Sequence, residues 1–211
     1  MSDNDVIARS PIPPSGPVRV AAGWELSAAR SDADLTITDA SPLAKVSVRA
    51  PWNGLMAKAL GISFGRAARD GETLVVGSGP GEWLLLAAPG TADAVTERVT
   101  ALAAESAAGE FVTAVDLTHG RALMRITGPR SEDLLARLCG VDLADDMTPD
   151  GAAFRSSVAG VATDVIRDDR AGTRSYLLHC ERSAGRYLYG VLREAGASWG
   201  IGVSGFAPPG I

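Results

Sequence analysis

The chain has 211 residues and a mass of 21.7 kDa, which allows one large domain or two small ones. Hydrophobic residues make up 46% of the sequence and charged residues 21%, a composition typical of globular proteins that argues against disorder. The formal net charge is −5, and the arginines are scattered singly along the chain. Because no basic stripe is present to grip a phosphate backbone, we expect no nucleic-acid partner.

The compartment is predicted from the cysteines and the apolar runs. Cys139 and Cys180 lie far apart, in no CxxC pattern and beside no metal-ligand neighbour, so we expect reduced thiols packed in a core. No apolar run approaches the ~18–20 residues that a membrane-spanning helix needs. The acidic and then proline-rich start is unlike a secretory signal, and these features together predict a cytoplasmic protein with no membrane contact.

The ends of the chain are predicted to be extended. Residues 1–22 contain four prolines and read as an N-terminal arm outside the core, either disordered or laid on a partner. Residues 208–211 form a similar short tail. We therefore expect a single domain over residues 23–207.

The first half of this domain is predicted over about residues 35–117. Alternating and β-branched segments indicate strands, i/i+4 apolar spacing indicates helices, and Gly61 suits the position just after a helix. The expected order is a strand over 45–49, a helix over 53–60, strands over 73–77 and 82–88, a helix from Thr91 to about 103, and a strand over 111–117.

The second half, about residues 118–207, shows the same order of patterns. The expected elements are a strand over 123–127, a helix over 131–139, strands over 157–166 and 174–180, a helix that begins at Ser183, and a strand over 199–206. Residues 59–62 align with 138–141, and residues 82–86 align with 174–178 within one residue. We therefore predict an α+β fold in which two tandem, pseudo-symmetric βαββαβ-like units form one body.

Two short motifs are candidates for chemistry. Gly77–Gly81 looks like a phosphate-binding loop, but such a loop needs a helix after its glycines and a strand is predicted there, so a hairpin turn is favoured. In the stretch DLTHGR, Asp116 or His119 could act as an acid or base, and Arg121 could hold a carboxylate. Asp116, Thr118 and Gly120 are also typical of a turn between strands, and we favour this structural interpretation.

The remaining polar candidates also favour structural roles. His179 lies in an apolar strand without a second histidine nearby, which favours a core or sheet-face position. Asp142, Asp145 and Asp146 match no calcium loop and are expected in a solvated loop. No nucleophile elbow, Walker loop or HExxH motif occurs, so we assign no catalytic, cofactor-binding or metal-binding residue.

The four tryptophans divide into two groups. Trp83 lies among leucines and is expected in the core. Trp24, Trp52 and Trp199 lie near the arm or at element ends, where burial and contact with a partner are both open.

A family resemblance rests on the stretch VDLTHGRALMRITGPRSEDLLARLCGVDL, Val115 to Leu143. Together with GEWLLLAAPG (81–90), TDVIRDDRAGTRSYLLHC (163–180) and ERSAGRYLYGVLREAG (181–196), it resembles the folate-binding domain of glycine-cleavage aminomethyltransferases. Within that superfamily it is most similar to the gamma subunits of heterotetrameric sarcosine oxidases. The resemblance extends from about Trp24 to Phe206 and implies a fold of two similar α+β halves.

The resemblance also implies a function. Such oxidases demethylate sarcosine to glycine, produce hydrogen peroxide and pass the one-carbon unit to tetrahydrofolate. The alpha chain is expected to carry NAD and the folate site, and the beta chain FAD and FMN. The gamma chain would hold no cofactor and act structurally, mainly against alpha, in a complex with the beta and delta chains. A full aminomethyltransferase is longer, and the KGCYxGQ motif of iron–sulfur maturation relatives is missing, so we transfer no folate-binding or catalytic residue.

Two hypotheses therefore remain open at the level of sequence. In the first, the chain is a non-catalytic structural subunit of a sarcosine oxidase. In the second, it is a free-standing folate-binding one-carbon transfer protein or sensor, with DLTHGR at the mouth of a crevice between the halves.

Overall fold

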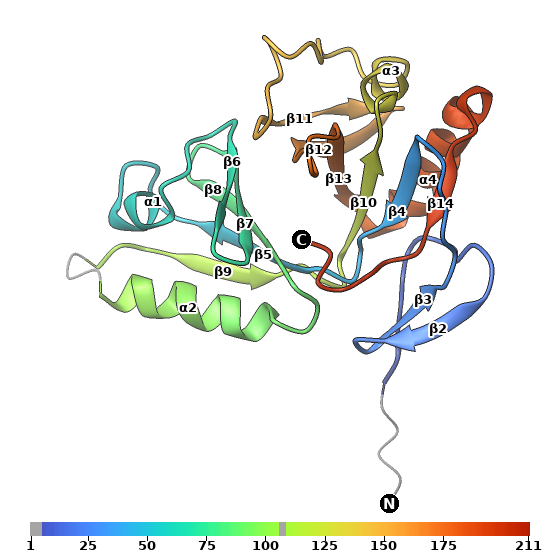
Figure 1. The fold of residues 1–211 in the computed structure, drawn as a ribbon. Coiled ribbons are helices and arrows are strands. Elements are labelled where there is room, and N and C mark those ends of the chain that lie inside the picture. The colour runs from blue at the N-terminus through green and yellow to red at the C-terminus, as the bar shows by residue number, and fades with distance from the viewer. Residues whose placement is uncertain (1–5, 106–108) are drawn as a thin grey trace, which may run out of the picture.

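The computed structural model describes residues 6–105 and 109–211, and two β-sheets with helices on their outer faces form most of it (Figure 1). The first sheet has five strands in the order β6-β7-β8-β5-β9. Its strands and helices are β5 (Ala44–Arg49), α1 (Leu55–Leu60), β6 (Ala67–Asp70), β7 (Thr73–Gly79), β8 (Glu82–Ala87), α2 (Ala92–Ala104) and β9 (Thr113–Asp116). Apolar residues of β5 and β8 pack against both helices, which gives this sheet a helical outer layer.

The second sheet has six strands in the order β11-β12-β13-β10-β4-β14. Its elements are β4 (Thr36–Asp39), β10 (Arg121–Thr127), α3 (Ser131–Ala136), β11 (Ala153–Val158), β12 (Val161–Arg167), β13 (Ser175–Glu181), α4 (Arg182–Gly196), the 3₁₀ turn η1 (Ala197–Trp199) and β14 (Gly202–Ser204). Helix α4 places Leu188 and Leu192 on a face that packs on Met124 and Leu178 of the sheet. This packing gives the second sheet its own apolar layer.

The two halves share an order of elements, and the predicted α+β class is confirmed. Each half contains one strand more than the predicted βαββαβ order, namely β6 and β11. The single strand predicted over 157–166 is wrong, because Ala159 and Gly160 take positive φ values of 49° and 81° and turn the chain between β11 and β12. The last strand, predicted over 199–206, is reduced to residues 202–204 by the turn η1.

Strand β4 departs from the predicted boundary between the halves. It precedes β5 in sequence, yet it pairs with β10 on one side and with β14 on the other. The chain enters β4 past Gly128, whose φ is 138° and where a Cβ atom would lie 2.0 Å from the carbonyl oxygen of Asp34. Residues 36–39 therefore belong to the sheet of the second half.

A third apolar cluster fills the space between the two sheets. It brings Leu84 and Leu86 of β8 against Ile166 and Leu177 of the second sheet, all at most 3% exposed. Phe206 joins this cluster, and Ile211 at the C-terminus packs against it, so residues 208–211 end on the protein itself. Figure 1 shows the C-terminus between the two halves.

The N-terminal segment differs from the predicted extended arm outside the core. From residue 8 it lies on the protein, where β1 (Ala8–Arg9), β2 (Val18–Ala21) and β3 (Trp24–Ser27) form a small sheet in the order β1-β3-β2. Ile12 is buried in the core of the second half. The prolines argued against strands in this segment, but Ile12, which lies between two of them, is still buried in the core.

The β12–β13 turn offers a test of backbone strain. Ala171 and Gly172 have φ values of 48° and 77°, and Ala171 is exposed. Two positive φ values in a two-residue hairpin favour Asn-Gly, since alanine is strained there. We expect Ala171→Asn to raise the free energy of unfolding by about 0.5–1 kcal/mol, measured by urea denaturation. Ala171→Val is the control and should lower it.

None of the helices in the described residues is long and apolar enough to cross a membrane.

Candidate functional site

The DLTHGR stretch forms the connection between the two halves, from β9 into β10. The Asp116 carboxylate accepts a hydrogen bond from the backbone N–H of Thr118 (2.8 Å), and the N–H of Gly120 donates to Leu117 O (3.0 Å). The backbone N–H of Lys45 donates to Thr118 Oγ1 (3.0 Å). The structural interpretation of the motif as a turn is therefore confirmed.

His119 and Arg121 show what remains available for chemistry. The His119 ring stacks on Trp24, with ring centroids 4.9 Å apart, in the wall of a pocket of about 420 Å³ that Asp93 and Asp116 also line. Arg121 forms an ion pair with Glu181, so its guanidinium is already engaged. The motif thus borders a surface pocket but brings together no nucleophile with a base.

Lys45 is an unusual buried group beneath this turn. Its side chain is fully buried, and its Nζ donates to the carbonyl oxygens of Ser41 (2.6 Å) and Leu43 (2.7 Å). Burial lowers the pKa of Lys45 to about 7, against the opposing attraction of Asp39 and Asp116. The lysine satisfies backbone carbonyls and has no access to solvent.

His179 is buried, as the sequence predicted, on the face of β13 directed at the first sheet. Its Nδ1 lies 2.8 Å from Asp164 Oδ2, and Arg155 Nε donates to Asp164 Oδ1 (2.6 Å). Burial lowers the pKa of His179, although the hydrogen bond with Asp164 opposes this shift. In the described part of the chain His179 Nε2 has no hydrogen-bond partner.

Asp168 organises a cluster of arginines between the two sheets, in which Asp168 and Arg125 are buried and Arg69 and Arg170 are partly exposed. Its carboxylate accepts hydrogen bonds from Arg69 (2.8 Å) and Arg125 (2.7 Å), and Arg170 Nε lies 3.2 Å from it. Arg125 also donates to Ser175 Oγ (2.9 Å), and burial lowers the pKa of Arg125 to about 10. Because Arg69 comes from β6 of the first half, this cluster contains side chains from both halves.

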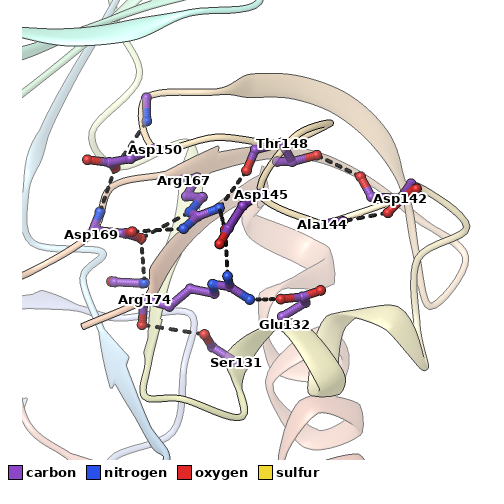
Figure 2. Close-up of polar contacts among 12 residues, drawn as sticks. Ser131, Glu132, Asp142, Ala144, Asp145, Thr148, Asp150, Arg167, Asp169 and Arg174 are labelled. Atoms are coloured by element: carbon purple, nitrogen blue, oxygen red, sulfur yellow. Dashed lines mark hydrogen bonds and ion pairs between the residues drawn. The ribbon is translucent and has the colours of Figure 1, made fainter. Parts of the chain in front are cut away.

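A second polar cluster holds the loop of residues 142–150 on the second sheet (Figure 2). Arg167 is buried and donates to Asp169 Oδ2 (3.0 Å) and to the carbonyl oxygen of Thr148 (2.7 Å). Asp145 pairs with both Arg167 and Arg174, and Arg174 also pairs with Glu132 of α3. The carboxylates of Asp145, Asp169 and Glu132 each form an ion pair with an arginine, so we assign the cluster to stabilising this loop.

The remaining candidates lie where core or surface residues are expected, with one correction. Cys139 and Cys180 are free and buried, and Gly77–Gly81 forms the β7–β8 hairpin, as predicted. Asp145 does not lie in a merely solvated loop, because it joins the ion pairs of Figure 2. Among the described residues no group of three histidine, cysteine or acidic side chains is arranged to hold a metal.

The tryptophans are now assigned to separate environments. Trp83 and Trp24 are both 4% exposed, and Trp83 Nε1 donates to Ile62 O (2.8 Å). Trp199 is partly buried under Arg137, whose guanidinium carbon lies 3.7 Å from the ring centre. Only Trp52 among the four is strongly exposed, at 72%.

The sequence did not indicate the Asp168 cluster. Its arginines come from β6, β10 and the β12–β13 turn, which are distant in sequence, and Arg69 of β6 reaches the other two because the two sheets face each other. One signal was available in β10. Arg121, Leu123 and Arg125 are two residues apart and so share one face of the strand, which places two arginines on the face of a buried leucine.

Comparison with known proteins identifies the family. The family model of the GCVT N-terminal domain matches residues 67–208, about two thirds of the chain. The chain belongs to this family. The family resemblance read from the sequence is thus confirmed, and the matched region of the GCVT N-terminal domain takes in part of the first half and all of the second. No curated protein matches the chain at a significant level.

Two solved structures share the fold of this GCVT-family chain. A chain of the heterotetrameric sarcosine oxidase from Corynebacterium sp. U-96, in complex with pyrrole 2-carboxylate, is 21% identical with a TM-score of 0.67. That match covers 78% of this chain and 85% of the other. The glycine cleavage system aminomethyltransferase T from Bartonella henselae is 17% identical with a TM-score of 0.68, and 90% of this chain covers 55% of it. At these identities the comparisons establish the fold.

Proposed function

We propose that this chain is the gamma subunit of a heterotetrameric sarcosine oxidase and has a structural, non-catalytic role. The observation that carries the proposal is the extent of the match: 78% of this chain covers 85% of a chain from such an oxidase. The aminomethyltransferase is matched over only 55% of its length. The likeness therefore takes in more of the oxidase chain than of the transferase, and we base the proposal on the oxidase.

The proposed assembly oxidises the N-methyl group of sarcosine and releases glycine. Oxygen is reduced to hydrogen peroxide, and the one-carbon unit passes to tetrahydrofolate. We assign NAD and the folate site to the alpha chain, and FAD and FMN to the beta chain. This chain would contact alpha, beta and delta and carry none of these groups.

The interior supports this assignment of folate to another chain. The space between the two sheets is filled by side chains such as Leu84, Leu86 and Leu177, all at most 3% exposed. A pterin ring there would have to displace several buried apolar side chains, so the residues present do not fit folate between the halves.

Exposed aromatic residues support a role in assembly. Trp52 is 72% exposed and Phe64 is 61% exposed, and both line a groove of about 540 Å³ with Trp83 and the Gly79–Gly81 turn. Its lining residues carry no charge. Exposed tryptophan on an apolar groove is typical of protein interfaces, and the occupant we propose is an apolar segment of the larger chains.

The test is to purify this chain together with candidate alpha and beta chains of a sarcosine oxidase. We expect co-elution as one complex in size-exclusion chromatography, and higher oxidase activity per flavin when this chain is present. A stable monomer that never co-elutes with either chain would contradict the proposal.

A substitution at the groove tests the surface itself. We expect Trp52→Ser to weaken association with the larger chains by roughly 10-fold or more, because exposed interface tryptophans contribute strongly to binding. The measurement is a titration by biolayer interferometry. Phe111→Ser removes another exposed aromatic residue away from the groove and is the control. Equal affinity of wild type and Trp52→Ser would exclude the groove.

Folate binding by the isolated chain is the second candidate, favoured only by the pocket of about 420 Å³ beside the stacked Trp24 and His119 rings. Calorimetry with tetrahydrofolate decides between the two roles. A saturable signal that His119→Ala abolishes would favour the second candidate, and no heat at millimolar ligand would remove it.

A further inference from the structure

The Asp168 cluster carries more positive charge than its own carboxylate neutralises. Three guanidinium groups, those of Arg69, Arg125 and Arg170, surround the single Asp168 carboxylate. The neighbouring Asp169 is engaged by Arg167 in the other cluster. The net charge of the whole chain is −5, so this is a local positive surplus on an acidic protein.

Two of the three arginines have donors left over. Arg125 is nearly buried and uses both terminal nitrogens on Asp168 and Ser175. In the described part of the chain Arg69 bonds Asp168 through NH2 alone, and Arg170 approaches Asp168 through Nε alone. Their side chains are 37% and 33% exposed, so the remaining N–H groups can reach a ligand from solvent.

Rigid elements position both exposed arginines. Arg69 lies in β6, at one edge of the first sheet. Arg170 lies in the β12–β13 turn, where its backbone exchanges two hydrogen bonds of 2.8 Å with Thr173. Asp168 then joins the two guanidinium groups at the surface where the two halves meet. Such preorganisation lowers the entropic cost of binding.

We propose that Arg69 and Arg170, backed by Arg125, bind an acidic side chain of a larger partner subunit. Guanidinium forks match carboxylates in geometry, and a second carboxylate would reduce the surplus positive charge. The inference rests on the proposed function, because it names a contact within that assembly. Arg69 and Arg170 are partly exposed where the two halves meet, so a side chain that protrudes from another protein can reach them.

The test uses the double variant R69Q/R170Q. In this variant the buried charges of Arg125 and Asp168 still neutralise each other. We therefore expect the melting temperature to change little. Affinity for the co-purified alpha and beta chains should fall about tenfold or more at low salt. Added sodium chloride should weaken wild-type binding more than it weakens binding of the variant. The control is Arg186→Gln, which removes an exposed arginine of α4.

The outcomes separate this inference from the proposed function. If wild type and R69Q/R170Q bind the larger chains equally, the inference is overturned while the subunit role stands. If wild type never binds them, the proposed function itself fails and the inference with it. A large drop in melting temperature, repeated in the single variant R170Q, would show that the arginines only hold the fold. Saturable binding of citrate that the double variant abolishes would assign the cluster to a small anion and also overturn the proposal.

Discussion

Replacing Asp168 by asparagine is expected to lower the free energy of unfolding by about 3–5 kcal/mol. The variant leaves Arg125 buried without a counter-charge, and its neighbours Arg69 and Arg170 then repel it. Breaking a buried ion pair by removing one partner costs far more than the intact pair contributes, because the other charge stays desolvated. Urea denaturation at constant m-value provides the measurement.

The design of this experiment isolates the charge. Asp146→Asn makes the same chemical change at an exposed position without an ion pair in the described residues, and should be nearly neutral. Asp168→Asn combined with Arg125→Gln should recover part of the loss, since the pair then carries no buried charge. A loss below about 1 kcal/mol for Asp168→Asn would show that Asp168 does not neutralise a desolvated charge on Arg125.

Stability is expected to rise between pH 7 and pH 8.5 through the buried Lys45. The pKa of Lys45 is lowered from 10.5 to about 7 in the folded protein, so above pH 7 the unfolded chain binds a proton that the folded chain does not. Unfolding then takes up a proton, and the free energy of unfolding increases with pH. Over this interval the gain is about 1–2 kcal/mol, and below pH 7 the full cost of burying the charge remains.

Lys45→Met should remove this pH dependence, as measured by urea denaturation at half-unit pH steps. The exposed Lys58→Met is the matched control and should keep the wild-type slope. The window ends at pH 8.5 because burial raises the pKa of the Cys180 thiol to about 11, and ionisation of that thiol in the unfolded chain lowers stability at higher pH. An unchanged slope in Lys45→Met would assign the effect to another group.

Local patterns were sufficient for the parts of the fold that depend on short-range order. The leucines of β8 and the spacing of α4 indicate their elements directly, because burial on one face imposes a period on the sequence. Strand β6 escaped prediction because Ala67–Asp70 is short and mostly exposed, so it shows no apolar alternation. Strand β11 merged with β12 because nothing in Ala159 signals a positive φ.

The polar contacts could be predicted from the sequence only where they join residues close together in the chain. The turn chemistry of Asp116 and Thr118 was readable, since it acts over two residues. The pairing of Asp145 with Arg167, or of Trp24 with His119, joins residues 22 and 95 positions apart. Such contacts depend on how elements stack, which composition and spacing do not encode.

The sequence by itself determined the α+β class, the repetition of one pattern of strands and helices apart from β6 and β11, the buried thiols and the family. Only the tertiary structure decided that β4 enters the sheet of the second half, that the space between the sheets is filled, and that three arginines share Asp168. The physical reason is that secondary structure follows from interactions a few residues apart. Strand pairing and ion-pair partners are instead set by the register and packing of segments far apart in the chain.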